Sequence, residues 1–277
     1  MFINPNLYVS LILSVLLYFA GIRLAGKITD GKALYSVAAL LMLLCMPGLS
    51  FLVYYLHLFD DSLWYIQFRS VPGIECAVSL CALFTGFVMA GFLRRKGDLF
   101  GGVLRITVNV MMVIVIVTPF IKPILTPVAK VTSFRDCWKD GVCLQSGTST
   151  CGPSSLATIF KAYGIDTTEE KISRSCYSCS TGTENWYLIR YAARNGFKAR
   201  LMNDRNLSGI PCPSILGTRL GSIGHFIILL KHDGGRLVIG DPLCGRLDLA
   251  QEAFRKRYAF DGFAMNFSRD DRDYQYK

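Results

Sequence analysis

Four residues in the second half of the chain have the types and spacing that thiol catalysis needs: Gln145, Cys151, His225 and Asp241. A thiolate nucleophile requires a base that takes and returns a proton, and that base requires a partner that fixes its orientation. Cys151 would be the nucleophile, His225 the base and Asp241 the partner of the imidazole. The predicted elements around these residues decide whether they can meet.

Cys151 is predicted to be the first residue of a helix. Apolar residues recur after it with helical spacing, at Leu156, Ile159, Phe160 and Tyr163. Gly164 ends this pattern, and Pro153 suits a first helical turn, where its missing amide costs nothing. The helix dipole and the free amide groups at this end of a helix favour a thiolate.

His225 begins an apolar segment that is predicted to form a strand, and residues 236–240 are predicted to return as the second strand of a hairpin. The turn lies at residues 233–235. Residues that open one strand and close the other are neighbours across the ladder, so His225 and Asp241 can meet. His232 is seven residues beyond His225, an odd offset that predicts the opposite face and makes it the poorer candidate.

Gln145 precedes Cys151 by six residues, in a loop rich in Ser, Gly and Thr. Its side-chain amide could donate a hydrogen bond to a tetrahedral oxyanion, together with the backbone N–H of Cys151. The alternative is a loop glutamine exposed to solvent. Its place before Cys151 favours the oxyanion role.

The order of four motifs in the second half of the chain resembles that of the bacteriocin-processing, double-glycine peptidases. The motifs are a Gln, then Cys-Gly-Pro opening a helix, then His-Phe heading a strand, and then Asp-Pro closing a hairpin. These form family thirty-nine of the cysteine peptidases, in the papain-like superfamily. The resemblance covers roughly residues 138–262 and includes a helical stretch at 186–196. It implies a papain-like α+β domain, in which the helix bearing the nucleophile packs on an antiparallel sheet. It also implies a triad of Cys151, His225 and Asp241, with Gln145 at the oxyanion hole, and a peptide or protein substrate.

The first half of the chain is predicted to be an all-α membrane region. Its four apolar runs each approach the roughly 20 residues that a bilayer-spanning helix needs. They extend from about Leu7 to Ala25, Ala33 to Leu56, Val71 to Leu93 and Leu99 to Ile121. We therefore expect a transmembrane region at 1–130, in contact with lipid, and a peptidase domain at 131–277.

Charges in the loops predict the orientation of the spans. The first loop carries Arg23, Lys27 and Lys32 with one acid, Asp30, and the third carries Arg94, Arg95 and Lys96. The second carries Asp60 and Asp61 with a single Arg69. Basic loops stay in the cytoplasm, so both termini are expected on the outer side. The prediction is a multi-pass protein of a bacterial inner membrane with an extracytoplasmic peptidase domain. Its substrate could then be membrane-associated, and separate membrane partner proteins are possible.

Composition excludes two other classes of function. The net charge is +10, but the basic residues of the second half are scattered among acidic ones, and no basic stripe or nucleic-acid motif is present. No Walker-type phosphate loop occurs, although the best-known members of the similar family precede the membrane and ATPase domains of an exporter. The expected chemistry uses no cofactor and no metal.

Cysteines of the second half suggest disulfides. There are seven, namely Cys137, Cys143, Cys151, Cys176, Cys179, Cys212 and Cys244. In an oxidising compartment six could pair and leave Cys151 free, with the pairing undetermined. Cys176 and Cys179 form a C-x-x-C motif, for which a redox pair or half of a zinc site are the alternatives.

Three other functions stay open. The domain could be a non-catalytic peptide-binding or scaffold domain of the same fold. It could be a membrane thiol oxidoreductase that uses Cys176 and Cys179. It could also catalyse another acyl transfer, such as amidase or transglutaminase chemistry, which sequence does not separate from peptide hydrolysis.

Overall fold

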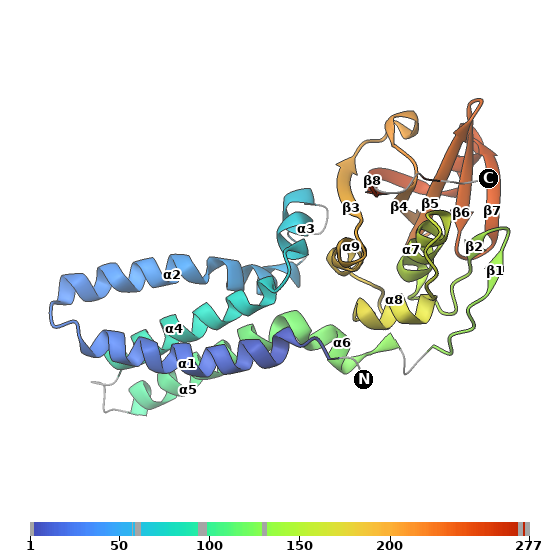
Figure 1. Ribbon diagram of the computed structural model, residues 1–277. Helices are drawn as coiled ribbons and strands as arrows, with labels where there is room; N and C mark the ends of the chain where they lie inside the picture. The colour runs from blue at the N-terminus through green and yellow to red at the C-terminus, as the bar shows by residue number, and fades with distance from the viewer. Residues whose placement is uncertain are drawn as a thin grey trace. The chain divides into compact units, whose positions relative to one another are not determined.

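The computed structural model describes residues 3–56, 58, 62–93, 99–128, 132–270 and 274. Beyond the first two residues, the chain forms two compact units, which we describe separately (Figure 1). One consists of Ile3–Asp60 and Gly73–Ile124. The other consists of Asp61–Pro72 and Leu125–Lys277, so a short segment of the first half of the chain belongs with the second half.

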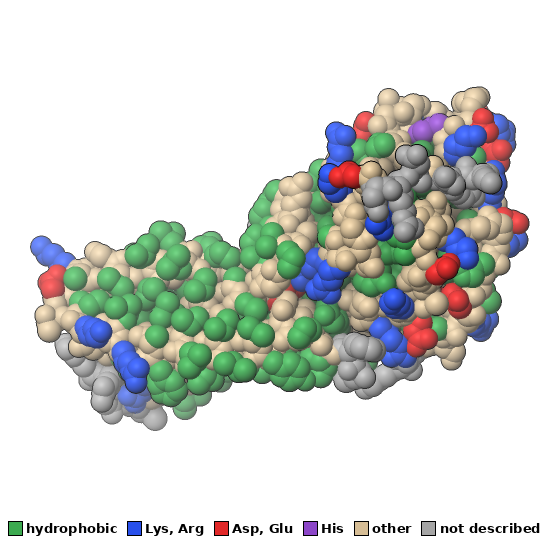
Figure 2. All heavy atoms as spheres, in the orientation of Figure 1, with side chains coloured by type: hydrophobic (Ala, Val, Ile, Leu, Met, Phe, Trp, Pro, Cys, Tyr) green, Lys and Arg blue, Asp and Glu red, His purple; other side chains and the backbone are tan. Residues whose placement is uncertain are grey.

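The first unit is helical. Its elements are α1 (Asn6–Gly26), α2 (Gly31–Tyr54), η1 (Ile74–Val78), α4 (Ser79–Val88), η2 (Met89–Leu93), α5 (Leu99–Val117), η3 (Thr118–Phe120) and α6 (Ile121–Leu125). Four helical stretches are long and apolar enough to cross a membrane: Asn6–Gly26, Gly31–Tyr54, Ile74–Phe92 and Gly101–Leu125. They correspond to the four predicted spans, and they indicate a membrane protein. In Figure 2, hydrophobic side chains cover the visible face of this unit.

Helices α1 and α4 approach each other closely at two glycines. A Cβ on Gly21 would lie 2.1 Å from the Leu83 carbonyl oxygen, and a Cβ on Gly86 would lie 2.0 Å from the Tyr18 carbonyl oxygen. Only glycine fits at either position. Such contacts between small residues are a common way for membrane helices to pack, because lipid tails provide no hydrophobic drive for helix association.

The second unit combines helices with a mainly antiparallel sheet. Its elements are α3 (Leu63–Ser70), β1 (Trp138–Lys139), β2 (Val142–Cys143), α7 (Cys151–Ala162), α8 (Glu169–Ser175), α9 (Asn185–Arg194), β3 (Lys198–Asn203), η5 (Leu207–Gly209), β4 (Ser214–Leu220), β5 (Ile223–Asp233), β6 (Arg236–Asp241), β7 (Gly245–Ala250), α10 (Gln251–Arg257) and β8 (Ala259–Ser268). The six-stranded sheet has the order β3-β8-β4-β5-β6-β7, and every neighbouring pair is antiparallel.

Helix α7 packs on one face of the sheet, against β5, and is covered by α8 and α9 (Figure 1). Helix α10 and η5 close the other face, where Phe254 and Leu207 join a core with Ile227, Leu229 and Ile239 of the central strands. This arrangement is a papain-like α+β fold, as expected from the sequence: the helix that begins with Cys151 lies on an antiparallel sheet.

The predicted hairpin is confirmed. Strand β5 contains His225, β6 ends at Asp241, and the two strands pair in an antiparallel register that starts with Asp233 opposite Arg236. Gly234 and Gly235 both have positive φ, which the turn requires and which glycine adopts without strain. One extra residue interrupts the register between Leu229 and Lys231.

Helix α3 packs against α9 within this second unit. Its inward side chains Tyr65, Ile66 and Arg69 are buried, and the Arg69 guanidinium lies 4.1 Å from the centroid of a Trp186 ring. Arg190 of α9 also donates a hydrogen bond to the Arg69 carbonyl oxygen. A segment between the second and third apolar helices therefore contributes to the packing of the sheet-containing unit.

We expect Arg69→Ala to destabilise this unit by about 2 kcal/mol, the magnitude of a desolvated cation–π contact. That corresponds to a melting temperature lower by roughly 4–8 °C for a unit of this size. The melting temperature is measured through Cys176, which is fully buried next to α9 and becomes exposed when the unit unfolds. The full chain is heated with a thiol-labelling reagent, and labelling of the Cys176 peptide is followed by mass spectrometry. Arg200→Ala, at an exposed position of β3, should leave the melting temperature of the unit unchanged. Equal temperatures for the two variants would contradict the stabilising role of α3.

Candidate active site

Cys151 is the first residue of α7, as predicted, and its side chain is partly exposed, whereas residues 152–160 are buried. Gly152 allows this end of the helix to lie against its neighbours. A Cβ there would lie 3.0 Å from Leu188 Cδ1 and 3.3 Å from Phe226 Cδ2. The thiol is thus held next to the start of β5, at the end of the helix where the amide groups are free.

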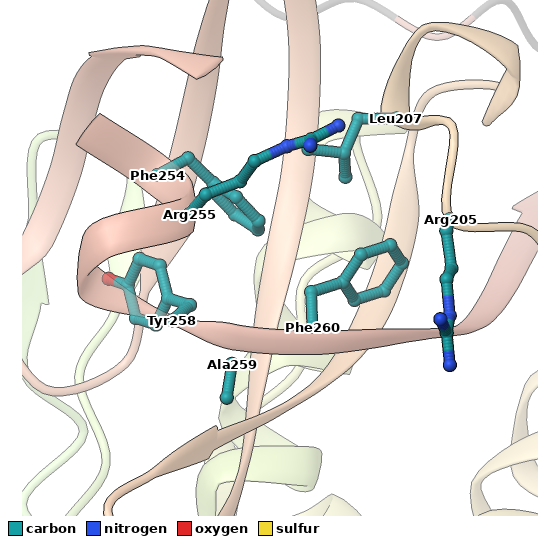
Figure 3. Close-up of a pocket in the computed structure, with 7 residues that line it drawn as sticks. All are labelled: Arg205, Leu207, Phe254, Arg255, Tyr258, Ala259 and Phe260. Carbon is teal, nitrogen blue, oxygen red and sulfur yellow. The ribbon is translucent and has the colours of Figure 1, made fainter. Parts of the chain in front are cut away.

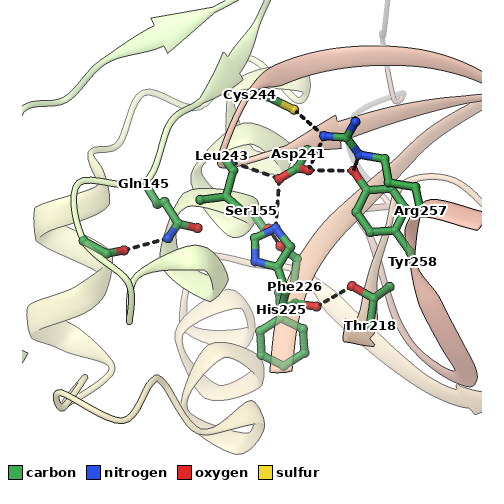
Figure 4. Close-up of polar contacts among 11 residues, drawn as sticks. Gln145, Ser155, Thr218, His225, Phe226, Asp241, Leu243, Cys244, Arg257 and Tyr258 are labelled. Carbon is green, nitrogen blue, oxygen red and sulfur yellow. Dashed lines mark hydrogen bonds and ion pairs between the residues drawn. The ribbon is translucent and has the colours of Figure 1, made fainter. Parts of the chain in front are cut away.

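His225 and Asp241 form a buried pair. His225 Nε2 lies 2.8 Å from Asp241 Oδ1, and the exposed fractions of the two side chains are 5% and 1%. The register that places Ile228 opposite Gly240 brings Asp241 diagonal to His225. The predicted proximity of these two side chains is therefore confirmed (Figure 4).

The environment favours the charged forms of both residues. Burial works against the imidazolium, but its hydrogen bonds with Asp241 and Cys151 and the charges of these two groups outweigh burial and raise the pKa of His225 to about 9. Burial likewise works against the carboxylate, but hydrogen bonds from His225, Tyr258 and the Leu243 amide lower the pKa of Asp241 to about 2. The pair is accordingly an imidazolium and a carboxylate near neutral pH.

Cys151 interacts with the same imidazole, through a hydrogen bond and through charge. Because Asp241 occupies Nε2, the nitrogen left for the thiol is Nδ1. The arrangement thus has a thiol, an imidazole and a carboxylate in sequence, the order of groups that a thiol nucleophile, its base and the orienting partner require.

Gln145 lies in the loop before α7, close to the end of β6. Its backbone N–H donates to the Pro242 carbonyl oxygen at 2.9 Å, and its Nε2 donates to the Gly147 carbonyl oxygen at 2.8 Å. One of the two amide hydrogens is thus used within the loop, and the other stays available to an oxyanion. Within the described part of the chain, the buried Gln145 Oε1 has no hydrogen-bond partner.

Glu169 holds the loop in place. This fully buried residue, the first of α8, accepts hydrogen bonds from the backbone N–H of Ser146, at 2.7 Å, and from the Ser146 hydroxyl. Ser146 follows Gln145, so the two bonds tie the loop to a helix. The sequence contains no local signal for this contact, because the partners are 23 residues apart.

Tyr258 and Arg257 are further neighbours of the pair that sequence patterns did not identify. The Tyr258 hydroxyl donates to Asp241 Oδ2 at 2.6 Å, and Arg257 Nε donates to the same hydroxyl oxygen at 3.0 Å. A cavity of about 250 Å³ lies beside the Tyr258 ring (Figure 3). It is lined by Arg205, Leu207, Phe254, Arg255, Tyr258, Ala259 and Phe260, and so contains none of the four predicted site residues.

The prediction of disulfides is wrong, because all ten cysteines are free thiols. In the C-x-x-C motif the two sulfurs have separate partners: Cys176 Sγ contacts the Tyr187 carbonyl oxygen, and Cys179 Sγ contacts Thr181 Oγ1. Burial raises the pKa of Cys176 well above its usual range, which disfavours a reactive thiolate. No group of three or more His, Cys, Asp or Glu side chains among the described residues is placed to hold a metal ion.

His232 lies apart from the pair, with its Nε2 3.0 Å from the Ile210 carbonyl oxygen. The extra residue between Leu229 and Lys231 interrupts the alternation on which its predicted facing rested. Seven residues of strand separate it from His225, so distance along β5 is what keeps it out of the site.

The sequence of this unit matches the model of the Peptidase C39 family over residues 139–271. This region is therefore similar to the Peptidase C39 family, and we call it the C39 domain. In the chain it follows the four apolar helices.

Among proteins with similar sequences is an uncharacterized protein of Methanothermobacter thermautotrophicus. It is 26% identical over 115 residues, which make up 42% of this chain and 80% of the relative. Another is the probable functional amyloid protease FapD of Pseudomonas aeruginosa, which is 26% identical over 129 residues. That match covers 43% of this chain and 53% of FapD.

Among solved structures, the peptidase domain of Streptococcus ComA, a bi-functional ABC transporter of a quorum-sensing pathway, is 21% identical with a TM-score of 0.42. The match covers 47% of this chain and 98% of that one. A double-glycine-motif protease from an AMS/PCAT transporter, in complex with its leader peptide, is 23% identical with a TM-score of 0.41. It covers 49% of this chain and 94% of that one.

The pKa of His225 predicts a pH dependence of stability. Between its usual value of 6.5 and about 9, the folded C39 domain keeps a proton that the unfolded chain has lost. Unfolding then releases this proton, so the contribution of His225, complete below about pH 6.5, disappears as pH rises through 9. The Asp241 contribution, complete above about pH 4, is lost as pH falls towards 2.

The measurement is thermal unfolding of the full chain in detergent across this range. Asp241→Asn should flatten the fall in stability between pH 6.5 and 9, because His225 then loses its charged partner. Asp248→Asn, which removes an exposed ion pair with Arg236, should keep the slope. An unchanged slope in Asp241→Asn would show that the pair does not control the His225 proton.

Proposed function

We propose that this protein is a membrane-anchored cysteine peptidase that cleaves a peptide or protein substrate at Cys151. The observation that carries the proposal is the buried His225–Asp241 pair, whose imidazole interacts with a thiol at the N-terminus of α7. The match to the Peptidase C39 family and the description of one relative as a probable protease support it.

In the proposed reaction, the Cys151 thiolate attacks the carbonyl carbon of the scissile peptide bond. The oxyanion accepts hydrogen bonds from the Cys151 backbone N–H and from the free amide hydrogen of Gln145. The His225 imidazolium then gives its proton to the leaving amine. Neutral His225 next removes a proton from water, which attacks the acyl-enzyme and releases the thiolate. Asp241 keeps Nε2 protonated throughout, so Nδ1 carries the exchanged proton.

The membrane side follows from the loop charges. Four spans place the segment that contains α3 and the C39 domain on the same side of the membrane, which agrees with their presence in one compact unit. The basic first loop favours the outer side for the domain. The charged residues of the second and third loops, Asp60, Asp61, Arg94, Arg95 and Lys96, lie outside the described residues. We propose an extracytoplasmic peptidase of a bacterial inner membrane, with a substrate at or near the membrane.

Replacement of Cys151 by Ala or Ser should lower peptide cleavage more than about a thousandfold, the scale of losing a catalytic nucleophile. It should also remove labelling of the Cys151 peptide by a thiol-directed covalent probe. Because the substrate is unidentified, the readout for cleavage is a comparison of the peptides from cells that express wild-type or Cys151→Ala protein. Cys137→Ser, which removes an exposed thiol outside α7, should change neither the cleavage nor the labelling of the Cys151 peptide. Peptides that are cut equally by wild type and Cys151→Ala would contradict the mechanism.

Cys137 also tests the membrane side, because it is the exposed thiol of the sheet-containing unit. A membrane-impermeant maleimide added to intact spheroplasts should modify it, as read by mass spectrometry of the Cys137 peptide. Labelling only after the membrane is permeabilised would place the domain in the cytoplasm instead.

A further inference from the structure

Both oxygens of the Asp241 carboxylate have donors. Oδ1 lies 2.8 Å from His225 Nε2 and accepts from the Leu243 backbone N–H at 2.9 Å, whereas Oδ2 accepts from the Tyr258 hydroxyl at 2.6 Å (Figure 4). The Asp241 side chain is 1% exposed, so water cannot replace a missing donor. A buried carboxylate oxygen without a donor would have nothing to replace its lost solvation.

The Tyr258 hydroxyl is held in position by the fold. Its ring is 1% exposed, packs within the core below the sheet and lies 5.3 Å from the Phe254 ring centroid. Its backbone N–H donates to the Phe254 carbonyl oxygen at 2.9 Å, at the end of α10. With both backbone and ring fixed, the hydroxyl points at Asp241 without further loss of rotamer freedom.

Arg257 determines the direction of the hydrogen bonds. Its Nε lies 3.0 Å from the Tyr258 hydroxyl, and a guanidinium can only donate. The hydroxyl therefore accepts from Arg257 and gives its single hydrogen to Asp241 Oδ2, because an ionised carboxylate can only accept. A second Arg257 nitrogen lies 3.9 Å from the same Oδ2. Such a chain of donors strengthens each bond along it.

We propose that Tyr258, polarised by Arg257, is a positioning residue that keeps Asp241 ionised and turned towards His225, so that the imidazole presents Nδ1 to Cys151. This assignment rests on the proposed function for the catalytic roles of His225 and Cys151. Tyr258 acts through Asp241 and touches neither the thiol nor the proposed scissile bond.

Loss of the Tyr258 hydroxyl has a definite physical consequence. Oδ2 would lose its donor at 2.6 Å, and the nearest Arg257 nitrogen lies 3.9 Å away. The carboxylate would then be more basic and would hold the proton of the His225 imidazolium more tightly. Three other titratable groups face the pair: Cys151 of α7, Cys244 after β6, which also hydrogen-bonds to Asp241, and Lys139 of β1 beside Cys244.

The test is a direct titration of His225 in the full chain, solubilised in detergent and labelled with ¹³C at the histidine Cε1. The chain has three histidines, and His225→Gln identifies the relevant signal. In the wild type we expect a midpoint near pH 9. Tyr258→Phe should raise it by about one pH unit, the scale of one hydrogen bond to a charged group, because the carboxylate without this donor is more basic.

Tyr163→Phe is the matched control. Tyr163 is also a buried tyrosine, and its hydroxyl donates to the Phe267 carbonyl oxygen at 3.2 Å, away from the pair. It should leave the His225 midpoint unchanged. Arg257→Ala, at a side chain that is 47% exposed, should raise the midpoint by a smaller amount and preserve folding. In the Tyr258→Phe background, Arg257→Ala should add little, because Arg257 acts mainly through the hydroxyl.

A His225 midpoint that is the same in wild type, Tyr258→Phe and Arg257→Ala would overturn the assignment. If Tyr258→Phe does not fold, the midpoint of Arg257→Ala decides alone. The titration does not need a substrate, so its failure is distinct from a failure of the proposed function. A shifted midpoint together with cleavage that persists in Cys151→Ala would keep the positioning role and reject the peptidase mechanism.

Discussion

The site depends on the buried pair of His225 and Asp241. Burial disfavours both charges, so the pair is stable only where the fold supplies enough donors and opposite charge to outweigh that cost. Here the donors are the Leu243 amide and the Tyr258 hydroxyl, with Cys151 on the other side of the imidazole. The raised pKa of His225 and the lowered pKa of Asp241 both follow from these contacts. Most of the surrounding architecture serves to bring these groups together.

Each layer of the C39 domain contributes one part of that environment. The β5–β6 hairpin brings His225 beside Asp241, α7 supplies the thiol at an end with free amide groups, and α10 leads into Tyr258 on the other side of the sheet. The loop of Gln145 is tied to α8 through Glu169. The thiol, the imidazole and the glutamine amide thus come from separate elements, and each is fixed by buried packing or by hydrogen bonds.

The apolar helices are connected to the sheet-containing unit at two places in the chain. Four of them are long and apolar enough to span a bilayer, and the helix between the second and third packs with α9 of the sheet-containing unit. The sheet-containing unit is consequently built from two separate parts of the chain. This differs from a simple tether, in which only the connection after the last span would join the two units.

The sequence by itself determined what local patterns encode: four apolar runs, a helix starting at Cys151, a hairpin turning at Gly234 and Gly235, and hence the proximity of His225 and Asp241. These features depend on periodicity and on neighbours across one turn. The tertiary structure decided the contacts between distant residues, such as Tyr258 with Asp241, Glu169 with Ser146 and α3 with α9. It also decided that the cysteines are not paired. A disulfide requires two sulfurs to lie close together, and the number of cysteines in a sequence does not show where they lie in the fold.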